Sequence, residues 1–371
     1  MRILSPDFTP EFHCLAGACP DSCCRQGWQI VVDGEHLAQY RAMPGALGRQ
    51  VRDALTEEGG EPCFRMEGGT CTLLRPDGLC PIAAALGEEG LCHICHTHPR
   101  FIEEYGAERE IHFSMSCPEA ARLTLLREAP LAYGQERDET PVTSVNDIDP
   151  GQYFALRRLR RFAAALMQER RLAVYDRLAL LLRLAELAQP IFDGDRYGKL
   201  PPLLRRFREP GFRDRQLARA KRVRLRGASY LPEVALLRQT EHLGQELPAL
   251  LHTAVFTARS GDAFDRSCGT LTENLAVSLL MHYIPKAVND GDVRGRLLFA
   301  VFGCLFVRRM CVCTGRETPE DAAHFAGLFA KEIEHSEENV SALLDAWQAE
   351  GWAAHFTAQL PLPQKGEPHA V

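Results

Sequence analysis

The spacing of apolar residues divides the chain into two parts. From residue 151 onward, apolar residues recur at intervals of three and four positions, which is typical of helices packed on a core. This pattern predicts helices over 151–170 and 172–188, and Pro190 and the pair Pro201-Pro202 are expected to end this hairpin. Further helices are predicted over residues 232–258, 270–284, 293–313, 319–334 and 337–356.

The front of the chain lacks this periodicity and is rich in Gly, Pro and Cys. A short strand is expected near residues 28–32. The stretch Gly34 to Leu55 predicts one helix or two, with a break at Pro44-Gly45. A region with so few apolar residues in a pattern needs a covalent or metal staple to hold its fold.

We therefore expect a mainly α protein built from two parts. An irregular Cys-rich domain that binds a metal or a cluster is predicted over residues 1–130, and an all-α helical domain over 151–360. The polar stretch 131–150 is interpreted as a linker, and residues 361–371 as a flexible tail.

Charge follows a similar division. The 371 residues hold 43 Lys and Arg against 49 Asp and Glu, a net charge of −6, which argues against a general nucleic-acid binder. Residues 1–120 carry 9 basic and 18 acidic residues, whereas 157–228 carry 20 basic and 7 acidic ones. The basic middle has three interpretations: a solvated helix face, a docking surface for an acidic protein partner such as flagellin, or a nucleic-acid surface, which the acidic remainder of the chain disfavours.

The compartment decides what the cysteines mean. The N-terminus lacks the apolar core of a signal peptide. The most apolar run, residues 297–307, has 11 residues, whereas a membrane span needs about 20, so we interpret it as a buried helix. We expect a cytoplasmic protein without a membrane segment. Thiols stay reduced there, and clustered cysteines are more often metal ligands or catalytic groups than disulfides.

Ten of the 14 cysteines lie between Cys14 and Cys117, and the late four, from Cys268 on, lie in apolar helical surroundings and are expected to pack in a core. Thiolates two to four residues apart can converge on one soft cation. Ten thiols exceed one site, so there are two sites or some thiols only pack. The early cysteines are Cys14, Cys19, Cys23, Cys24, Cys63, Cys71, Cys80, Cys92, Cys95 and Cys117.

Ligand type alone does not separate zinc from an iron-sulfur cluster. Four thiolates suit tetrahedral zinc or a [4Fe–4S] cluster. The irregular spacing here favours iron-sulfur. The adjacent Cys23 and Cys24 point in divergent directions, so they can serve different irons or different sites.

Three cysteine-bearing strings carry a resemblance to a known family: FHCLAGACPDSCCRQGWQIVVD, TCTLLRPDGLCPIAAALGEEGLCHICHTHPRF and FSMSCPEAAR. A fourth string, TENLAVSLLMHYIPK, lies in the helical part. Together they resemble the flagellin lysine-N-methylase family, whose cysteine core is similar to that of the CxxCxxCC zinc- or iron-chelating proteins. The resemblance is dense over residues 11–125 and patchy, though in register, over 150–310.

This resemblance implies transfer of methyl groups from S-adenosylmethionine to flagellin lysines by an enzyme that contains an iron-sulfur centre, with zinc as the alternative metal. Cys63 and Cys92 fall outside the family pattern and are interpreted as extra, structural thiols. The metal ligands that the resemblance implies are Cys14, Cys19, Cys23, Cys24, Cys71, Cys80, Cys95 and Cys117.

Methyl transfer needs a neutral lysine amine aligned with the sulfonium methyl group. The catalytic candidates are Glu273, Asn274, Tyr283 and Tyr105, with helix capping as the other interpretation of the first two. The candidates for cofactor binding are Arg100, His98 and Trp28, each of which has a structural interpretation as a turn or core residue.

No Gly-rich loop of the usual methyltransferase type follows a predicted strand. We hypothesise that the iron-sulfur centre itself holds S-adenosylmethionine. The alternative function is a metal-chelating or electron-transfer protein that transfers no methyl group.

Overall fold

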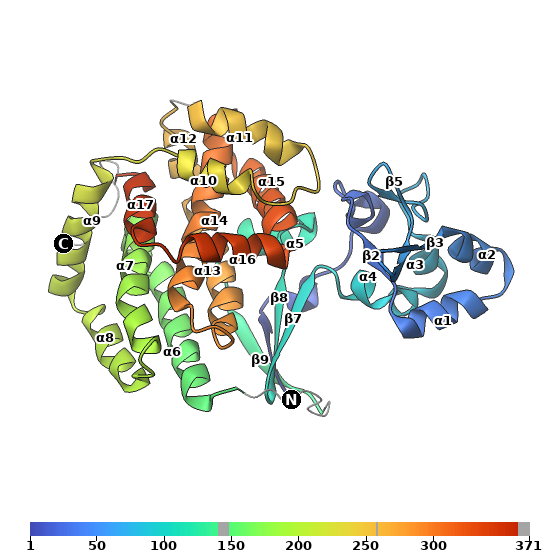
Figure 1. Cartoon of the computed structure of the whole chain (residues 1–371), viewed down its shortest axis with the longest axis horizontal. Coiled ribbons are helices and arrows are strands. Elements are labelled where there is room, and N and C mark those ends of the chain that lie inside the picture. The colour runs from blue at the N-terminus through green and yellow to red at the C-terminus, as the bar shows by residue number, and fades with distance from the viewer. Residues whose placement is uncertain (140–147, 257–258, 363–371) are drawn as a thin grey trace.

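The computed structural model describes residues 1–139, 148–256 and 259–362. It is mainly helical, with three small sheets. Figure 1 shows a large helical body and, to its right, a smaller lobe. The small lobe comprises residues 14–98 and is inserted between strands β1 (Arg2–Pro6) and β7 (Arg100–Tyr105).

Two long helices form the centre of the helical body. In α13 (Gly269–Lys286) and α14 (Val293–Thr314) nearly every side chain is buried, and α6 (Pro150–Met167) and α7 (Val174–Phe192) pack against them. The surrounding elements are α8 (Leu200–Arg206), α9 (Pro210–Arg224), α10 (Leu231–Leu237), α11 (Glu246–Phe256), α12 (Asp262–Ser267), α15 (Pro319–Phe329), the π-helical turn η6 (Ala330–Glu334), α16 (Glu337–Ala346) and α17 (Trp352–Gln359).

Most predicted helices are confirmed, and two are split. The stretch 337–356 forms α16 and α17, because Gly351 adopts a φ of 102° that a continuous helix does not allow. The stretch 232–258 forms α10 and α11, and residues 257–258 lie outside the described residues. Pro190 was expected to end its helix but lies inside the last turn of α7.

Helix α14 contains the apolar run 297–307. By length and composition it is long enough to cross a membrane, but 83% of its most apolar window is buried inside the protein. It contacts α7, α11, α13 and α15 along its length. This surrounding explains its composition as that of a core helix.

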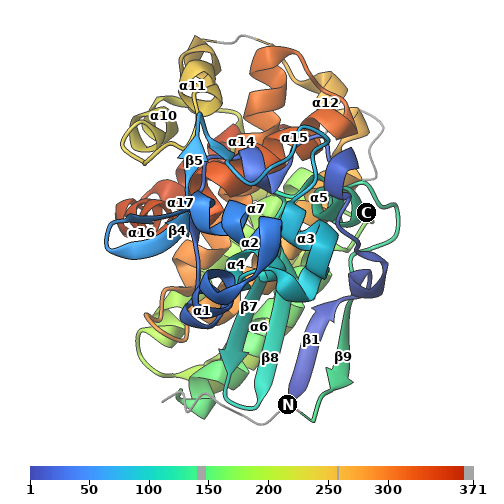
Figure 2. The ribbon, with the colours of Figure 1, turned by 90° about the vertical axis from the view of Figure 1, so that its right-hand side faces the viewer.

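A four-stranded sheet lies between the helical body and the small lobe. Its order is β7, β8 (Glu108–Phe113), β1 and β9 (Tyr133–Arg137), as Figure 2 shows from the side of the small lobe. β1 runs parallel to β8 and antiparallel to β9. Strand β9 occupies part of the predicted linker 131–150, of which residues 140–147 lie outside the described residues.

The boundary between the two parts differs from the predicted one at residue 130. Phe8, Phe12, Phe113 and helix α5 (Pro118–Leu125) belong to the core of the helical body. The small lobe has a separate core. The chain enters the body first, leaves it to form the lobe and then returns through β7, which the placement of cysteines in the sequence does not reveal.

Charged residues of β8, one of the two inner strands of this sheet, face the helical body. Glu110 is fully buried and accepts a hydrogen bond from Nη2 of Arg160 at 2.9 Å, and Glu108 accepts one from Arg157 at 2.7 Å. Arg157 and Arg160 both lie on α6. Buried ion pairs, rather than apolar contacts, therefore fix part of the sheet to the helical body.

The small lobe is built from short elements around ten buried residues. Its helices are α1 (Gly34–Ala42) and α2 (Gly45–Ala54), which confirm the break at Pro44-Gly45, followed by α3 (Pro81–Leu86) and α4 (His93–Thr97). Its strands are β2 (Ile30–Val31), β3 (Leu55–Glu58), β4 (Glu61–Phe64), β5 (Met66–Glu67) and β6 (Thr70–Cys71).

We predict that Arg160→Met lowers the free energy of unfolding by about 3–5 kcal/mol, because it leaves the carboxylate of Glu110 buried without its partner. Urea unfolding followed by circular dichroism measures this loss. Arg158→Met, at an exposed position of the same helix, is the matched control and should change stability by less than about 0.5 kcal/mol. Equal effects of the two substitutions would contradict the role of the pair.

Candidate functional site

The early cysteines form two groups in space, and all of them are free thiols. We define the second thiol set as the cysteines in or against the core of the small lobe: Cys24, Cys71, Cys80, Cys92 and Cys95. We define the first thiol set as those at the junction with the helical body: Cys14, Cys19, Cys23 and Cys117, of which Cys117 packs against the core of the body.

The thiols of each set influence one another electrostatically. A hydrogen bond with Cys24 raises the pKa of Cys23, as do burial and the charges of Cys24, Cys14 and Cys117. In the second set, burial and the neighbouring thiols raise the pKa of Cys71 to about 11. The hydrogen bond with Cys23 lowers the pKa of Cys24 to about 7. The adjacent pair Cys23-Cys24 is therefore the point at which the two sets meet.

Backbone N–H groups donate hydrogen bonds to sulfur in both sets. The sulfur of Cys71 accepts one from Leu73, and the sulfur of Cys117 accepts from Glu119 and Ala120. Burial is the larger effect and raises the pKa of both thiols overall, whereas these donors act in the opposite direction and favour the thiolate that a metal requires. Cys19, Cys80 and Cys92 have the same kind of donor, from residues two or three positions later.

The residue types of the two thiol sets fit a thiolate-bound metal. Among the described residues, no three Cys, His, Asp or Glu side chains converge as ligands of one ion do. Binding therefore requires the thiols of a set to turn toward a common point. Cys63, by contrast, is buried on β4, and the four late cysteines are buried in the body, where they were expected to pack.

Glycines bring the two cysteine-bearing loops of the lobe together. A Cβ at Gly78, which has a φ of 78°, would lie 3.2 Å from Cα of Gly17, so neither loop tolerates a side chain there. A pocket of about 270 Å³ opens beside this contact and is lined by Cys19, Ser22 and Arg25. The first thiol set thus borders a solvent-accessible cavity.

The small lobe meets the helical body along a line that we call the seam. Nε2 of Gln26 donates to the carbonyl oxygen of Ser116 at 3.2 Å, and Lys331 of η6 forms an ion pair with Asp21. Both contacts lie close in sequence to the first thiol set. The seam therefore joins residues that are up to 310 positions apart in the chain.

Four rings gather at the seam, and we call them the seam rings: Trp28, His98, Phe101 and His335. The centroid of His335 lies 4.5 Å from Trp28, 5.1 Å from Phe101 and 6.0 Å from His98. Burial, His335 and Arg100 lower the pKa of His98 to about 3, and burial lowers the pKa of His335 to about 4. Both imidazoles are therefore neutral at pH 7.

Two serines of the string FSMSC orient His335. Its Nε2 lies 2.9 Å from the hydroxyl of Ser114 and 3.0 Å from that of Ser116. The indole N–H of Trp28 is buried and has no hydrogen-bond partner among the described residues. The seam rings thus hold one satisfied imidazole and one unsatisfied donor.

A titratable cluster lies behind the seam rings. His282 stacks on Phe101 at 4.6 Å, and Glu103 pairs with Lys286 at 2.6 Å. Burial raises the pKa of Glu334 to about 7, while a hydrogen bond with Tyr283 and the charge of Lys286 oppose the shift. Glu334 lies in η6, and π-helical turns occur frequently at functional sites.

The four predicted catalytic residues are not brought together. Glu273 is buried and pairs with Arg170 and Arg177, and the amide of Asn274 donates to the carbonyl oxygen of Arg127. Both lie inside α13 and not at its start, so the expected capping is wrong. Tyr283 lies ten residues further along α13, about 15 Å away by helical rise, and Tyr105 stacks on Tyr153 at 5.3 Å.

Two of the three predicted cofactor-binding residues lie at the seam, and the third does not. Trp28 and His98 are both seam rings, with centroids 5.3 Å apart. The guanidinium of Arg100 lies over the rings of Phe12 and Phe113, at 5.0 and 5.4 Å. Arg100 thus fixes the end of β7 to the core and lies on the other side of the strand from the seam.

Sequence reasoning missed several residues of this site. His335 and Glu334 have no motif around them, because their neighbours at the seam come from distant segments. Cys92 was set apart as structural, yet it hydrogen-bonds Cys95 in the second thiol set. Its spacing of three from Cys95 was the available signal.

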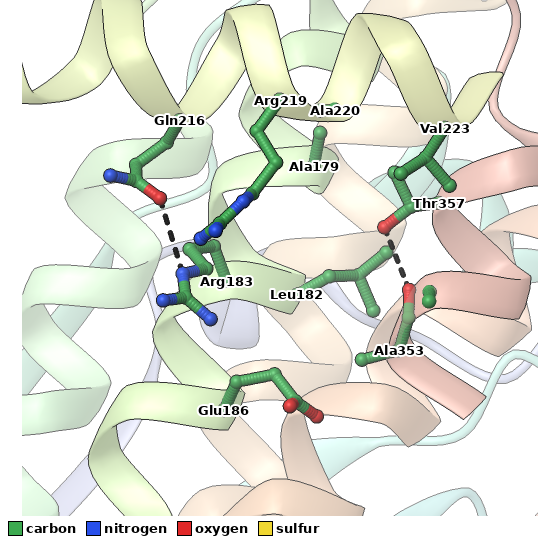
Figure 3. Close-up of a pocket in the computed structure, with 11 residues that line it drawn as sticks. Ala179, Leu182, Arg183, Glu186, Gln216, Arg219, Ala220, Val223, Ala353 and Thr357 are labelled. Carbon is green, nitrogen blue, oxygen red and sulfur yellow. Dashed lines mark hydrogen bonds between the residues drawn. The ribbon is translucent and has the colours of Figure 1, made fainter. Parts of the chain in front are cut away.

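A basic pocket lies elsewhere on the helical body, between α7, α9 and α17 (Figure 3). Nε of Arg183 donates to Gln216 at 3.1 Å, and Arg219 projects into the same pocket. Burial and the charge of Arg219 lower the pKa of Arg183, and Glu186 opposes this. Within the described ranges no carboxylate forms an ion pair with Arg183 or Arg219.

Comparison with protein-family models, with curated proteins and with solved structures finds no match to this chain.

We predict that Glu334→Gln removes a pH dependence of stability. The folded pKa of about 7 lies above the ordinary value of 4.5, so this residue's contribution is present at low pH and is lost as pH rises through 7. From about pH 5 to pH 8 the free energy of unfolding of the wild type should fall by roughly 1–3 kcal/mol relative to that of the variant. Urea unfolding at both pH values measures the difference, and a constant difference would contradict the prediction.

Proposed function

We propose that this protein transfers methyl groups from S-adenosylmethionine to the lysine side chains of flagellin and contains a thiolate-bound iron-sulfur centre. One observation carries the proposal: the four strings of the family resemblance meet around the seam rings. Trp28 and His98 come from the first two strings. Ser116 comes from the third and His282 from α13, which is the fourth.

The seam rings suit cationic groups. A sulfonium or an alkylated ammonium binds over aromatic faces, which contributes about 0.5–2 kcal/mol depending on desolvation. Trp28 and Phe101 supply such faces, and the neutral His335 adds a ring without a repelling charge. S-adenosylmethionine supplies an electrophilic methyl group when bound, and the rings would orient it and exclude water.

Proton transfer requires a group that titrates near pH 7. A lysine attacks only as the neutral amine, so its proton must leave first. Glu334 has a pKa of about 7 and connects to the seam through Tyr283, His282 and Phe101. We assign Glu334 as the proton acceptor, with Tyr283 as the residue that positions it. Glu273, Asn274 and Tyr105 lie in other contacts and receive no role in this proposal.

The metal centre would be held by the thiol sets. Their backbone N–H donors stabilise thiolates, which are the ligands of iron-sulfur clusters. Such a cluster supplies a redox-active iron centre when it is bound. The pocket lined by Cys19, Ser22 and Arg25 would give small molecules access to a centre held by the first thiol set.

The basic pocket supports the docking of an acidic protein. Arg183 and Arg219 are close enough to repel each other and form no ion pair with a carboxylate of the described residues, so a carboxylate of a partner would relieve this repulsion. Helix α9, which lines the pocket, carries the exposed Lys221 and Arg222 in its last turn. The partner proposed for this surface is the flagellin substrate.

The proposed function is tested by incubating anaerobically purified protein with flagellin and S-adenosylmethionine labelled in the methyl group. Label should appear on flagellin lysines, identified by peptide mass spectrometry. His335→Ala should lower the rate by roughly twofold to thirtyfold, because a cation–ring contact is lost. His324→Ala on α15, whose ring is partly exposed, is the control and should leave the rate unchanged.

Metal-loaded protein that transfers no label to flagellin would overturn the methyl-transfer proposal. That result would favour the alternative, a metal-chelating or electron-transfer protein. The observation that favours this alternative is the separate core of the small lobe, in which five cysteines lie in or against ten buried residues.

The docking proposal predicts that the double variant Arg183→Ala/Arg219→Ala weakens flagellin binding by about threefold to tenfold at low salt. The wild-type affinity should fall with rising ionic strength, and the variant should fall less steeply. Arg158→Ala, at an exposed position on α6, is the control. Equal salt dependence of wild type and variant, measured by surface binding of flagellin, would place the docking site elsewhere.

A further inference from the structure

The second thiol set lies entirely in the small lobe. In the second thiol set, Cys71 and Cys92 are core residues of the small lobe, with exposed fractions of 5% and 0%. Cys24, Cys80 and Cys95 pack against the same core. All five belong to the lobe, so a metal held among them would crosslink only the lobe's own short elements.

The first thiol set joins two parts of the molecule instead. Cys14, Cys19 and Cys23 lie on the segment by which the chain enters the lobe, whereas Cys117 immediately precedes α5 of the helical body. The charges of Cys14 and Cys19 act on Cys117, so the segments lie close together. A metal held there would crosslink the lobe to the body.

The adjacent residues Cys23 and Cys24 belong to different sets. Cys23 interacts with Cys14 and Cys117, and Cys24 with Cys71 and Cys80, while both act on Cys95. Cys23 and Cys24 also interact with each other through their side chains, so the two sets adjoin at this pair. The two sets nevertheless belong to different parts of the molecule, because Cys71 and Cys92 lie in the core of the lobe and Cys117 packs against the core of the body.

We propose that the protein holds two thiolate-bound metal centres, one in each thiol set, and that Cys92 is a ligand of the second. The second centre stabilises the small lobe, whose apolar core is small, and the first fixes the lobe against the body. The shared chemistry is a thiolate-bound metal, iron-sulfur or zinc. The inference rests on the metal-binding part of the proposed function and not on methyl transfer.

The test counts iron, zinc and acid-labile sulfide per chain in anaerobically purified full-length variants. Cys117→Ser removes a ligand of the first set, and Cys92→Ser/Cys95→Ser leaves three thiols in the second. Each should retain about half of the wild-type metal, and the triple variant none. Cys63→Ser is the matched control, because Cys63 is as fully buried in the lobe as Cys92, and it should retain all of the metal.

Folding of each variant is checked by its helical circular dichroism, which the body dominates. If loss of the second centre unfolds the lobe and releases the first, Cys117→Ser still decides, because its side chain lies outside the core of the lobe. Complete metal loss in Cys117→Ser, or none, would overturn the proposal. Sulfide distinguishes iron-sulfur from zinc, and two centres without methyl transfer would refute only the enzymatic proposal.

Discussion

The small lobe has a small apolar core of its own, and one thiol set lies in or against this core while the other lies at the junction with the helical body. Its core has ten buried residues, two of which are cysteines, and its strands are two to four residues long. Chains of this kind are usually held by disulfides or metals. All its cysteines are free thiols, and backbone N–H groups point at several sulfurs. Thiolate–metal bonds would supply the energy that burial does not, and they would do so next to the seam.

The helical body provides the opposite, a rigid support. Its large core surrounds α13 and α14, and buried ion pairs such as Glu110–Arg160 fix the sheet to it. The same sheet carries Phe101 to the seam, and η6 brings His335 to the same place. The small lobe and the helical body therefore meet through polar contacts, such as the ion pair of Lys331 with Asp21. Such a junction can position neutral rings and a titratable carboxyl beside a thiol set.

The sequence predicts the helices well because the apolar residues of α6 keep a helical period, and α13 and α14 are apolar over lengths that exceed those of buried strands. It did not predict β7 and β8, because the inward positions of β8 hold Glu108, Glu110 and His112 instead of apolar residues. The metal region that the cysteine spacing predicts stays a prediction, although the structure does bring most of the early cysteines into two neighbouring sets. The sequence could not place His335, whose partners lie more than 200 positions away.

The central claim is that sulfur from the front of the chain gathers around metal. X-ray absorption at the metal edge of the purified protein tests it most directly. The account predicts a first shell made of sulfur, at about 2.3 Å for zinc and with a further iron–iron shell for clusters. A first shell dominated by nitrogen or oxygen, or a protein that carries no metal after anaerobic purification, would contradict it.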